Sequence, residues 1–151
     1  MNNQQTEHIK KSHSEGIGGS SYHFETEMQV RDYECDIQGI VNNANYLHYL
    51  EHTRHMFRLA HGVSFIEMHD KGEDFVVARM QLQYKTPLRP DDVFRSCLRI
   101  KKEGVCYVFY QDIIRKSDNK MCFRAKVDAC CIVNGRLGES MVCNEALKEY
   151  I

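Results

Sequence analysis

The hydrophobic pattern of the chain changes its period twice along the sequence. Residues 22–30 alternate apolar and polar side chains, which is typical of a half-buried strand. A helical period of about 100° per residue follows, with its apolar face at Tyr46, Tyr49, Leu50, Thr53, Met56, Phe57 and Ala60. The pattern predicts a helix over residues 46–61 that is capped by Asn45 or Asn43 and ends at Gly62.

Beyond this helix, a short apolar cluster at residues 63–68 predicts one further helical turn. The period of two then returns in four segments, which are residues 76–84, 94–100, 105–113 and 121–133. Short turns join these segments, as in antiparallel hairpins. Residues 143–150 predict a short C-terminal helix capped by Asn144.

The order of these elements predicts an α+β fold, with one long helix and an antiparallel sheet of about five strands. One helix cannot cover both faces of such a sheet, so we expect the sheet to curl around the helix, a second copy of the chain to cover the remainder, or both. The 151 residues suit one domain. We expect residues 1–21 to be a disordered tail because they are mostly polar, and residues 22–151 to form the domain.

The charge balance narrows the classes of partner. Twenty Lys and Arg against 21 Asp and Glu give a net charge of −1, so the chain lacks the basic field that attracts nucleic acid or anionic lipid. No apolar run reaches the roughly 20 residues that cross a bilayer, and the polar N-terminus lacks the apolar stretch of a signal peptide. We therefore predict a cytoplasmic protein with no nucleic-acid or membrane partner.

The cysteines and histidines give little sign of metal chemistry. The seven cysteines include no CxxC pair and lie mostly in strand-like segments, so we interpret them as reduced, mostly buried thiols. The eight histidines include no HExxH motif, and His48, His52 and His55 come from one helix without a supporting carboxylate pattern. We expect no metal or other cofactor.

The segment before the long helix is the strongest candidate for catalysis. Asp36 precedes an irregular turn that contains Gly39 and leads into the helix N-terminus. Unpaired N–H groups at a helix N-terminus can polarise a carbonyl group while a nearby carboxylate acts as base or nucleophile. On spacing alone, however, an aspartate at this place is more often a cap or turn residue.

Residues 36–54, DIQGIVNNANYLHYLEHTR, resemble the signature of the hotdog-fold thioesterases of the 4-hydroxybenzoyl-CoA thioesterase type, D-x-x-G-x-V-x-x-x-N-Y-x-x-x-x-E-x-x-R. Residues 84–92, YKTPLRPDD, resemble the connection between two strands in that family. The resemblance covers about residues 22–150. It implies a curved antiparallel sheet wrapped around one long helix, a homodimer or homotetramer, and active sites at the subunit interface.

The same resemblance implies that the protein hydrolyses an acyl-CoA or acyl-carrier-protein thioester without a cofactor. By matching position, Asp36 is the catalytic acid, the backbone N–H of Asn43 polarises the thioester carbonyl, and Gly39 tightens the turn. The predicted substrate-binding residues in and near this segment are Gln38, Ile40, Val41, Asn42, Asn45, Tyr46 and Glu51. We add Arg89, a basic residue near a strand end.

Departures from the signature leave the mechanism open. Related branches often place a histidine where Ile40 stands, so Asp36 is the only evident acid–base group, with Gln38 a candidate to orient water. Attack by an activated water and an anhydride intermediate are both compatible with this loop.

Several charged residues have a structural interpretation beside the functional one. Glu51 matches the glutamate of the signature, but Arg54 and Arg58 follow it on the helix, and an ion pair is the simpler interpretation. Basic residues at strand ends could bind the phosphates of the substrate, or they could be solvated without a function. The candidates are Arg89, Arg95, Lys101 and Lys102.

Three other functions fit parts of the sequence. The first is an acyl-thioester binding module without catalysis, which the missing histidine at Ile40 favours. The second is a hydratase or dehydratase, although the chain lacks an Asp/His pair near the helix start. The third is a purely structural dimer. The sequence leaves the acyl chain length, the choice of CoA or carrier protein, and the choice of dimer or tetramer open.

Overall fold

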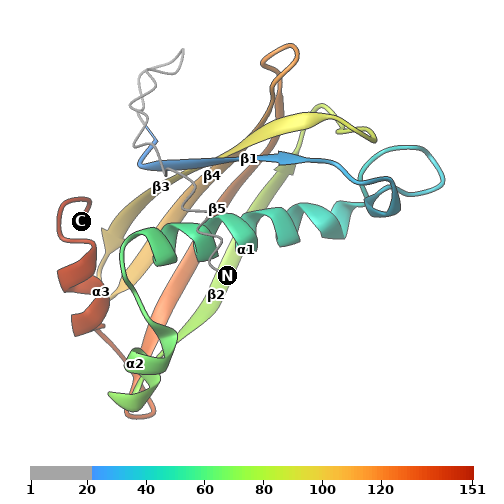
Figure 1. Ribbon diagram of the computed structural model, residues 1–151. Helices are drawn as coiled ribbons and strands as arrows, with labels where there is room; N and C mark the ends of the chain where they lie inside the picture. The colour runs from blue at the N-terminus through green and yellow to red at the C-terminus, as the bar shows by residue number, and fades with distance from the viewer. Residues whose placement is uncertain (1–21) are drawn as a thin grey trace, which may run out of the picture.

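A curved antiparallel sheet wraps around one long helix in the computed structural model, which describes residues 22–151 (Figure 1). The strands lie in the order β1 (Phe24–Gln29), β3 (Val93–Glu103), β4 (Cys106–Arg115), β5 (Met121–Val133) and β2 (Glu73–Tyr84), and β6 (Arg136–Gly138) also pairs with β5. Every pairing is antiparallel. The predicted fold class is confirmed, whereas the tail predicted for residues 1–21 lies outside the described residues.

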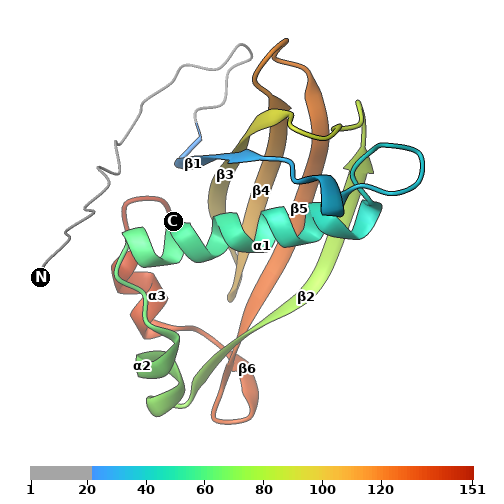
Figure 2. The ribbon, with the colours of Figure 1, turned by 45° about the vertical axis from the view of Figure 1, so that its right-hand side comes forward.

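The long helix α1 (Asn43–Ala60) crosses the concave face of the sheet (Figure 2). It begins earlier than predicted, and the capping residue is Asn42 rather than Asn45 or Asn43, because the N–H of Asn42 is held by the carbonyl of Glu34 outside the helix (2.9 Å). The side chain of Asn42 accepts from the N–H of Ala44 at 3.0 Å. Gly62 ends the helix region as predicted, with φ of +68°.

Two short helices flank one end of α1, namely α2 (Phe65–Asp70) and α3 (Met141–Ala146). The predicted cap of the C-terminal helix is wrong. Ser140 caps α3 by accepting from the N–H of Cys143 (3.0 Å), while Asn144 instead accepts a hydrogen bond from the hydroxyl of Tyr107 on β4. None of the helices in residues 22–151 is long and apolar enough to span a membrane.

The end of β5 continues into a hairpin that the sequence pattern did not reveal. Asn134 and Gly135 have φ of +49° and +81°, and this left-handed turn returns the chain as β6 (Figure 2). Three residues are too few to show a period. The buried carboxylate of Glu73 then fixes α3, because it accepts from the Ser140 hydroxyl (2.7 Å) and the Met141 N–H (3.1 Å).

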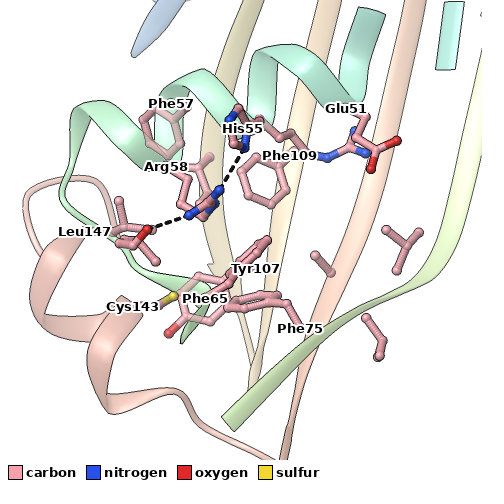
Figure 3. A pocket seen from close by; sticks show the side chains of 16 residues that line it. Glu51, His55, Phe57, Arg58, Phe65, Phe75, Tyr107, Phe109, Cys143 and Leu147 are labelled. Carbon is pink, nitrogen blue, oxygen red and sulfur yellow. Dashed lines mark hydrogen bonds between the residues drawn. The ribbon is translucent and has the colours of Figure 1, made fainter. Parts of the chain in front are cut away.

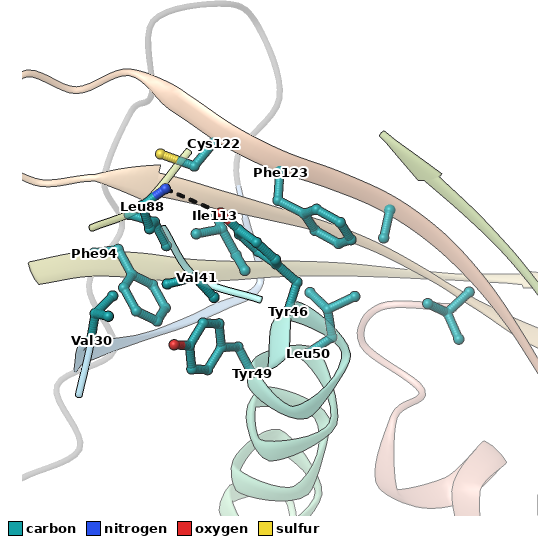
Figure 4. Close-up of a cluster of buried hydrophobic side chains, with 12 residues drawn as sticks. Val30, Val41, Tyr46, Tyr49, Leu50, Leu88, Phe94, Ile113, Cys122 and Phe123 are labelled. Atoms are coloured by element: carbon teal, nitrogen blue, oxygen red, sulfur yellow. Dashed lines mark hydrogen bonds between the residues drawn. The ribbon is translucent and has the colours of Figure 1, made fainter. Parts of the chain in front are cut away.

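The hydrophobic core has two parts, one under each half of α1. Under the C-terminal half, Phe57 packs near Tyr107 from the sheet, Cys143 from α3 and Leu147 directly after α3 (Figure 3). Under the N-terminal half, apolar and aromatic side chains from the helix, the sheet and the loops meet (Figure 4), and they include Val41, Tyr46, Tyr49, Leu50, Leu88, Phe94 and Phe123. The helix is thus anchored at both ends.

One cysteine prediction is corrected by the structure. Cys106 on β4 and Cys130 on β5 are directly opposite each other in the ladder and form a disulfide, so these two are not reduced thiols. The pairing depends on strand register, which the spacing of cysteines in the sequence does not reveal. The other five are free, and four of them are buried as predicted, namely Cys97, Cys122, Cys131 and Cys143.

Candidate active site

The loop between β1 and α1 forms a tight turn around Asp36. The N–H of Asp36 donates to the carbonyl of Ile40 (2.9 Å), and the N–H of Gly39 donates back to the carbonyl of Asp36 (3.0 Å). Gly39 has φ of +72°, a conformation that residues with a Cβ rarely adopt. The turn therefore requires the glycine that the sequence analysis singled out.

The carboxylate of Asp36 is half-exposed at this turn. One of its oxygens, Oδ1, accepts a hydrogen bond from the backbone N–H of Gln38 at 2.8 Å. This contact orients the carboxylate and leaves the other oxygen, Oδ2, without a hydrogen bond to residues 22–151. The side chain of Gln38 itself is exposed beside it.

The start of α1 presents a free backbone donor. Asn43 is the first residue of the helix, and its N–H has no acceptor within residues 22–151. The positive end of the helix dipole lies at the same place. Asn45 fixes this helix start to the loop, since its side-chain amide donates to the carbonyl of Glu34 at 2.7 Å.

Two of the predicted substrate-binding residues belong to the core and anchor the loop. Val41 is 3% exposed, and its N–H donates to the carbonyl of Leu88 (2.9 Å). Tyr46 is also 3% exposed, and its hydroxyl accepts from the N–H of Leu88 at 3.1 Å (Figure 4). Both residues therefore position the loop and the helix start against the segment that follows β2.

The loop also exposes apolar surface that the sequence analysis missed. Ile37, directly after Asp36, is fully exposed, and Tyr33 is 74% exposed. Ile40 is half-buried and Asn42 is exposed. An irregular loop has no period by which an apolar residue can be assigned to the surface or the core, so the exposure of Ile37 could not be predicted.

Glu51 lies away from this turn. It is eight residues along α1 from Asn43, or about 12 Å at the rise of an α-helix, and it lines a separate cavity under the C-terminal half of the helix (Figure 3). The predicted ion pair is wrong, because neither Arg54 nor Arg58 has a carboxylate within 4 Å among residues 22–151. Arg54 donates to Gln111 instead (2.8 Å), because its side chain turns toward the sheet.

The four basic candidates for phosphate binding do not form one cluster. Arg95 pairs with Glu25 (3.3 Å) and Lys102 with Glu139 (2.8 Å). Arg95 and Lys101 are six residues apart on β3, which is about 20 Å along a strand. Arg89 is exposed in the loop after β2, and its N–H donates to the carboxylate of Asp92.

No metal centre is formed by the histidines of α1. Among residues 22–151, no three His, Cys, Asp or Glu side chains gather in an arrangement that could hold a metal ion. His48 and His52 instead line a groove between α1, β1 and the loop that follows β1. Nδ1 of His55 contacts the Arg58 guanidinium at 2.7 Å.

Comparison with known proteins assigns the chain to a family. The thioesterase superfamily matches residues 38–123, a range that begins in the Asp36 turn and ends in β5, so the chain belongs to this superfamily. A chloroplastic acyl-acyl carrier protein thioesterase of Arabidopsis thaliana is 35% identical over 105 residues, which is 70% of this chain and 55% of that protein. The chain thus spans just over half the length of this plant relative.

Two further similarities agree with this assignment. The long-chain acyl-CoA thioesterase FadM of Escherichia coli is 28% identical over 109 residues, which is 72% of this chain and 82% of that protein. The crystal structure of a hypothetical protein from Aquifex aeolicus superimposes with a TM-score of 0.74 at 28% identity, covering 85% of this chain and 99% of that chain. The hotdog fold implied by the sequence resemblance is confirmed.

Proposed function

We propose that this protein hydrolyses acyl thioesters to a free carboxylic acid and a thiol. The observation that carries the proposal is the position of Asp36 in a closed turn that leads, seven residues later, to the unpaired N–H of Asn43 at the start of α1. Membership of the thioesterase superfamily supports this chemistry. The catalytic residues are then Asp36 and the backbone of Asn43, with Gly39 shaping the turn.

In the proposed reaction, the N–H of Asn43 stabilises the negative charge that develops on the thioester oxygen. Asp36 takes a proton from a water molecule, whose oxygen bonds to the carbonyl carbon. The carbon–sulfur bond then breaks, and the thiolate takes up a proton as it leaves. The alternative is direct attack by the Asp36 carboxylate, which forms an anhydride that water hydrolyses.

The substrate contacts are part of the same proposal. Gln38, Ile40 and Asn42 line the accessible side of the loop, and Asn45, Val41 and Tyr46 hold its geometry. Glu51 and Arg89 lie outside the loop and contact parts of the substrate remote from the thioester. The relatives act on either carrier-protein or CoA thioesters, according to their names, and both carriers remain candidates here.

The experiment compares wild type with Asp36→Asn on aromatic, short-, medium- and long-chain acyl-CoA and acyl-carrier-protein thioesters, by release of the thiol. Asp36→Asn is nearly isosteric and removes only the charge, so we expect turnover to fall by several orders of magnitude with the fold intact. Asp32→Asn changes an exposed acid four residues earlier and is the matched control. Wild-type rates in Asp36→Asn contradict the assignment.

A binding module without catalysis is the second candidate, and the lack of a histidine at Ile40 favours it. This candidate predicts saturable binding of a thioester without thiol release. The same substrate panel, followed by calorimetry on any thioester that is not hydrolysed, separates the two functions.

We further infer that the protein is a homodimer, or a tetramer built from such dimers. The outer edge of β2 pairs with no other strand in residues 22–151 and carries the exposed side chains of Val76 (44%) and Val77 (49%). A second copy that pairs at this edge extends the sheet. We expect light scattering after gel filtration to give at least twice the chain mass, and Val77→Lys to lower it.

The cytoplasmic location predicted from the sequence stays a prediction. Fractionation of cells that express the full chain tests it, and recovery in a membrane or organelle fraction contradicts it.

A further inference from the structure

The residues that follow α3, which we call the 147–151 segment, fold back toward the end of α1 (Figure 2). They form a turn in which the N–H of Tyr150 donates to the carbonyl of Leu147 at 2.9 Å. Leu147 is buried in the core under α1. The ring of Tyr150 lies 6.0 Å from the ring of Phe57 on α1, measured between ring centres. These two side chains fix the segment against the helix.

Two imidazole rings hold the side chain of Tyr150. The ring of His23, which directly precedes β1, stacks on Tyr150 with 4.6 Å between ring centres and 24° between ring planes. The ring of His61, which directly follows α1, places its Nε2 3.0 Å from the hydroxyl oxygen of Tyr150. Tyr150 therefore joins the start of β1 to the end of α1.

A hydrogen bond from β3 fixes the proton position on His23. The backbone N–H of Ile100 donates to Nδ1 of His23 at 3.1 Å, so this nitrogen carries no proton. The ladder between β1 and β3 ends with Phe24 opposite Leu98, and the imidazole satisfies a strand donor beyond that last pair. A protonated imidazole carries N–H groups on both nitrogens and cannot accept. The contact therefore requires His23 to be neutral.

The contacts of His61 do not have this requirement. Its Nδ1 lies 2.8 Å from the carbonyl oxygen of Phe57, which only accepts, so Nδ1 carries the proton. Its Nε2 accepts from the hydroxyl of Tyr150 when the ring is neutral, and donates to the same hydroxyl oxygen when the ring is protonated. Protonation of His61 thus keeps both contacts, whereas protonation of His23 removes the one with Ile100.

The groups that face His23 also oppose a positive charge on its ring. Burial and the positive charge of Arg99 on β3 lower the pKa of His23, and His61 lowers it to a smaller extent. The carboxylate of Glu149, in the 147–151 segment, acts in the opposite direction without cancelling them. A proton therefore binds His23 more readily once the ring has left Tyr150 and entered water.

We propose that the contacts of His23 with Ile100 and Tyr150 form a pH-sensitive latch, which holds the 147–151 segment on α1 at neutral pH and releases it in mild acid. The pKa of His23 is lower in the latched state than the roughly 6.5 of a free histidine. The latch is therefore fully stable above about pH 6.5, and it loses stability as the pH falls toward the lower pKa of the latched state.

Release of the latch affects more than the 147–151 segment. Leu147 and Cys143 of α3 belong to the wall of the cavity under the C-terminal half of α1. Acid should therefore loosen one end of that cavity while the sheet stays folded. The proposal goes beyond the proposed hydrolysis, because opening of the latch involves no thioester and is measured without turnover.

The test is hydrogen exchange of the Tyr150 amide, followed by NMR on the full chain at pH 7.5 and 5.5 and corrected for the intrinsic exchange rate at each pH. In wild type we expect its protection to fall by up to about tenfold at the lower pH, and that of Val127, buried in β5, to stay the same. His23→Gln keeps an acceptor for Ile100 without titrating, so its protection should not change with pH. His61→Gln is the matched control and should keep the pH dependence.

A second measurement needs no variant to keep the latch closed. NMR titration of the imidazole signals of wild type should give His23 a midpoint below the roughly 6.5 of a free histidine. Equal protection of Tyr150 at both pH values in wild type overturns the proposal, as does an equal fall in folded His23→Gln. A midpoint of His23 at or above that of a free histidine also overturns it. None of these outcomes bears on the proposed hydrolysis, which the substrate panel tests separately.

Discussion

The hydroxyl of Tyr84, at the end of β2, donates a hydrogen bond to the backbone carbonyl of Asn43, at the first residue of α1, over 2.9 Å. These residues are 41 positions apart in the sequence, and the contact joins the edge strand of the sheet to the start of the helix. Asn43 also carries the free N–H that we propose donates to the thioester oxygen. The sheet edge thereby helps to set the direction of that donor.

Tyr84→Phe tests this relationship. The side chain is 49% exposed, so we expect a loss of only about 0.5 to 1.5 kcal/mol in the free energy of unfolding. Thioester turnover should fall further than stability does, mainly through kcat, because the donor is less well fixed. Tyr33→Phe, at a more exposed tyrosine, should change neither the urea midpoint nor kcat. Equal kinetics for both variants exclude a positioning role.

Asn43→Pro removes the proposed oxyanion donor with little change in shape. Proline is favoured at the first position of a helix, and Asn42 already has the extended backbone (φ −59°, ψ 138°) that a following proline requires. We expect kcat to fall by about 100- to 1000-fold with nearly the same melting temperature. Asn43→Ala keeps the N–H and should retain most of the activity. If the alanine variant is equally impaired, the side chain rather than the backbone is responsible.

Leu50→Ala measures the contribution of the core under α1. Leu50 is completely buried, and its truncation should lower the free energy of unfolding by about 3 to 5 kcal/mol. Leu59, on the same helix, is 54% exposed, and Leu59→Ala should change it by less than about 0.5 kcal/mol. Urea unfolding followed by circular dichroism compares the two. Similar losses contradict the described orientation of the helix.

The thiols give a prediction that depends on pH. The unfolded, unreduced chain should titrate five thiols, and seven after reduction of the Cys106–Cys130 disulfide. In the folded protein, burial raises the pKa of Cys97 to about 12 and that of Cys143 to about 11. Both groups stay protonated at pH 8, so iodoacetamide should modify them slowly, and half-buried Cys35 first. Mass spectrometry of digested protein reports the order, and rapid modification of Cys97 contradicts it.

Local features of the sequence determined much of this protein. The apolar period identified α1 and the five long strands, because a side-chain period follows directly from backbone geometry. Gly39 and Gly62 were predicted at turns, and both have positive φ. The signature from Asp36 to Arg54 indicated the family. The catalytic role of Asp36 stays a prediction that the turn geometry supports.

Only the tertiary structure decided which distant residues meet. Strand register paired Cys106 with Cys130. The hydrogen bond from the N–H of Asn42 to the carbonyl of Glu34 made Asn42 the cap of α1, rather than Asn43 or Asn45. The packing of α1 on the sheet directed the guanidinium of Arg54 to Gln111 and placed Arg58 in the wall of a cavity. Each of these outcomes depends on contacts between segments far apart in the chain, and a local pattern of residues carries no information on which segments will touch.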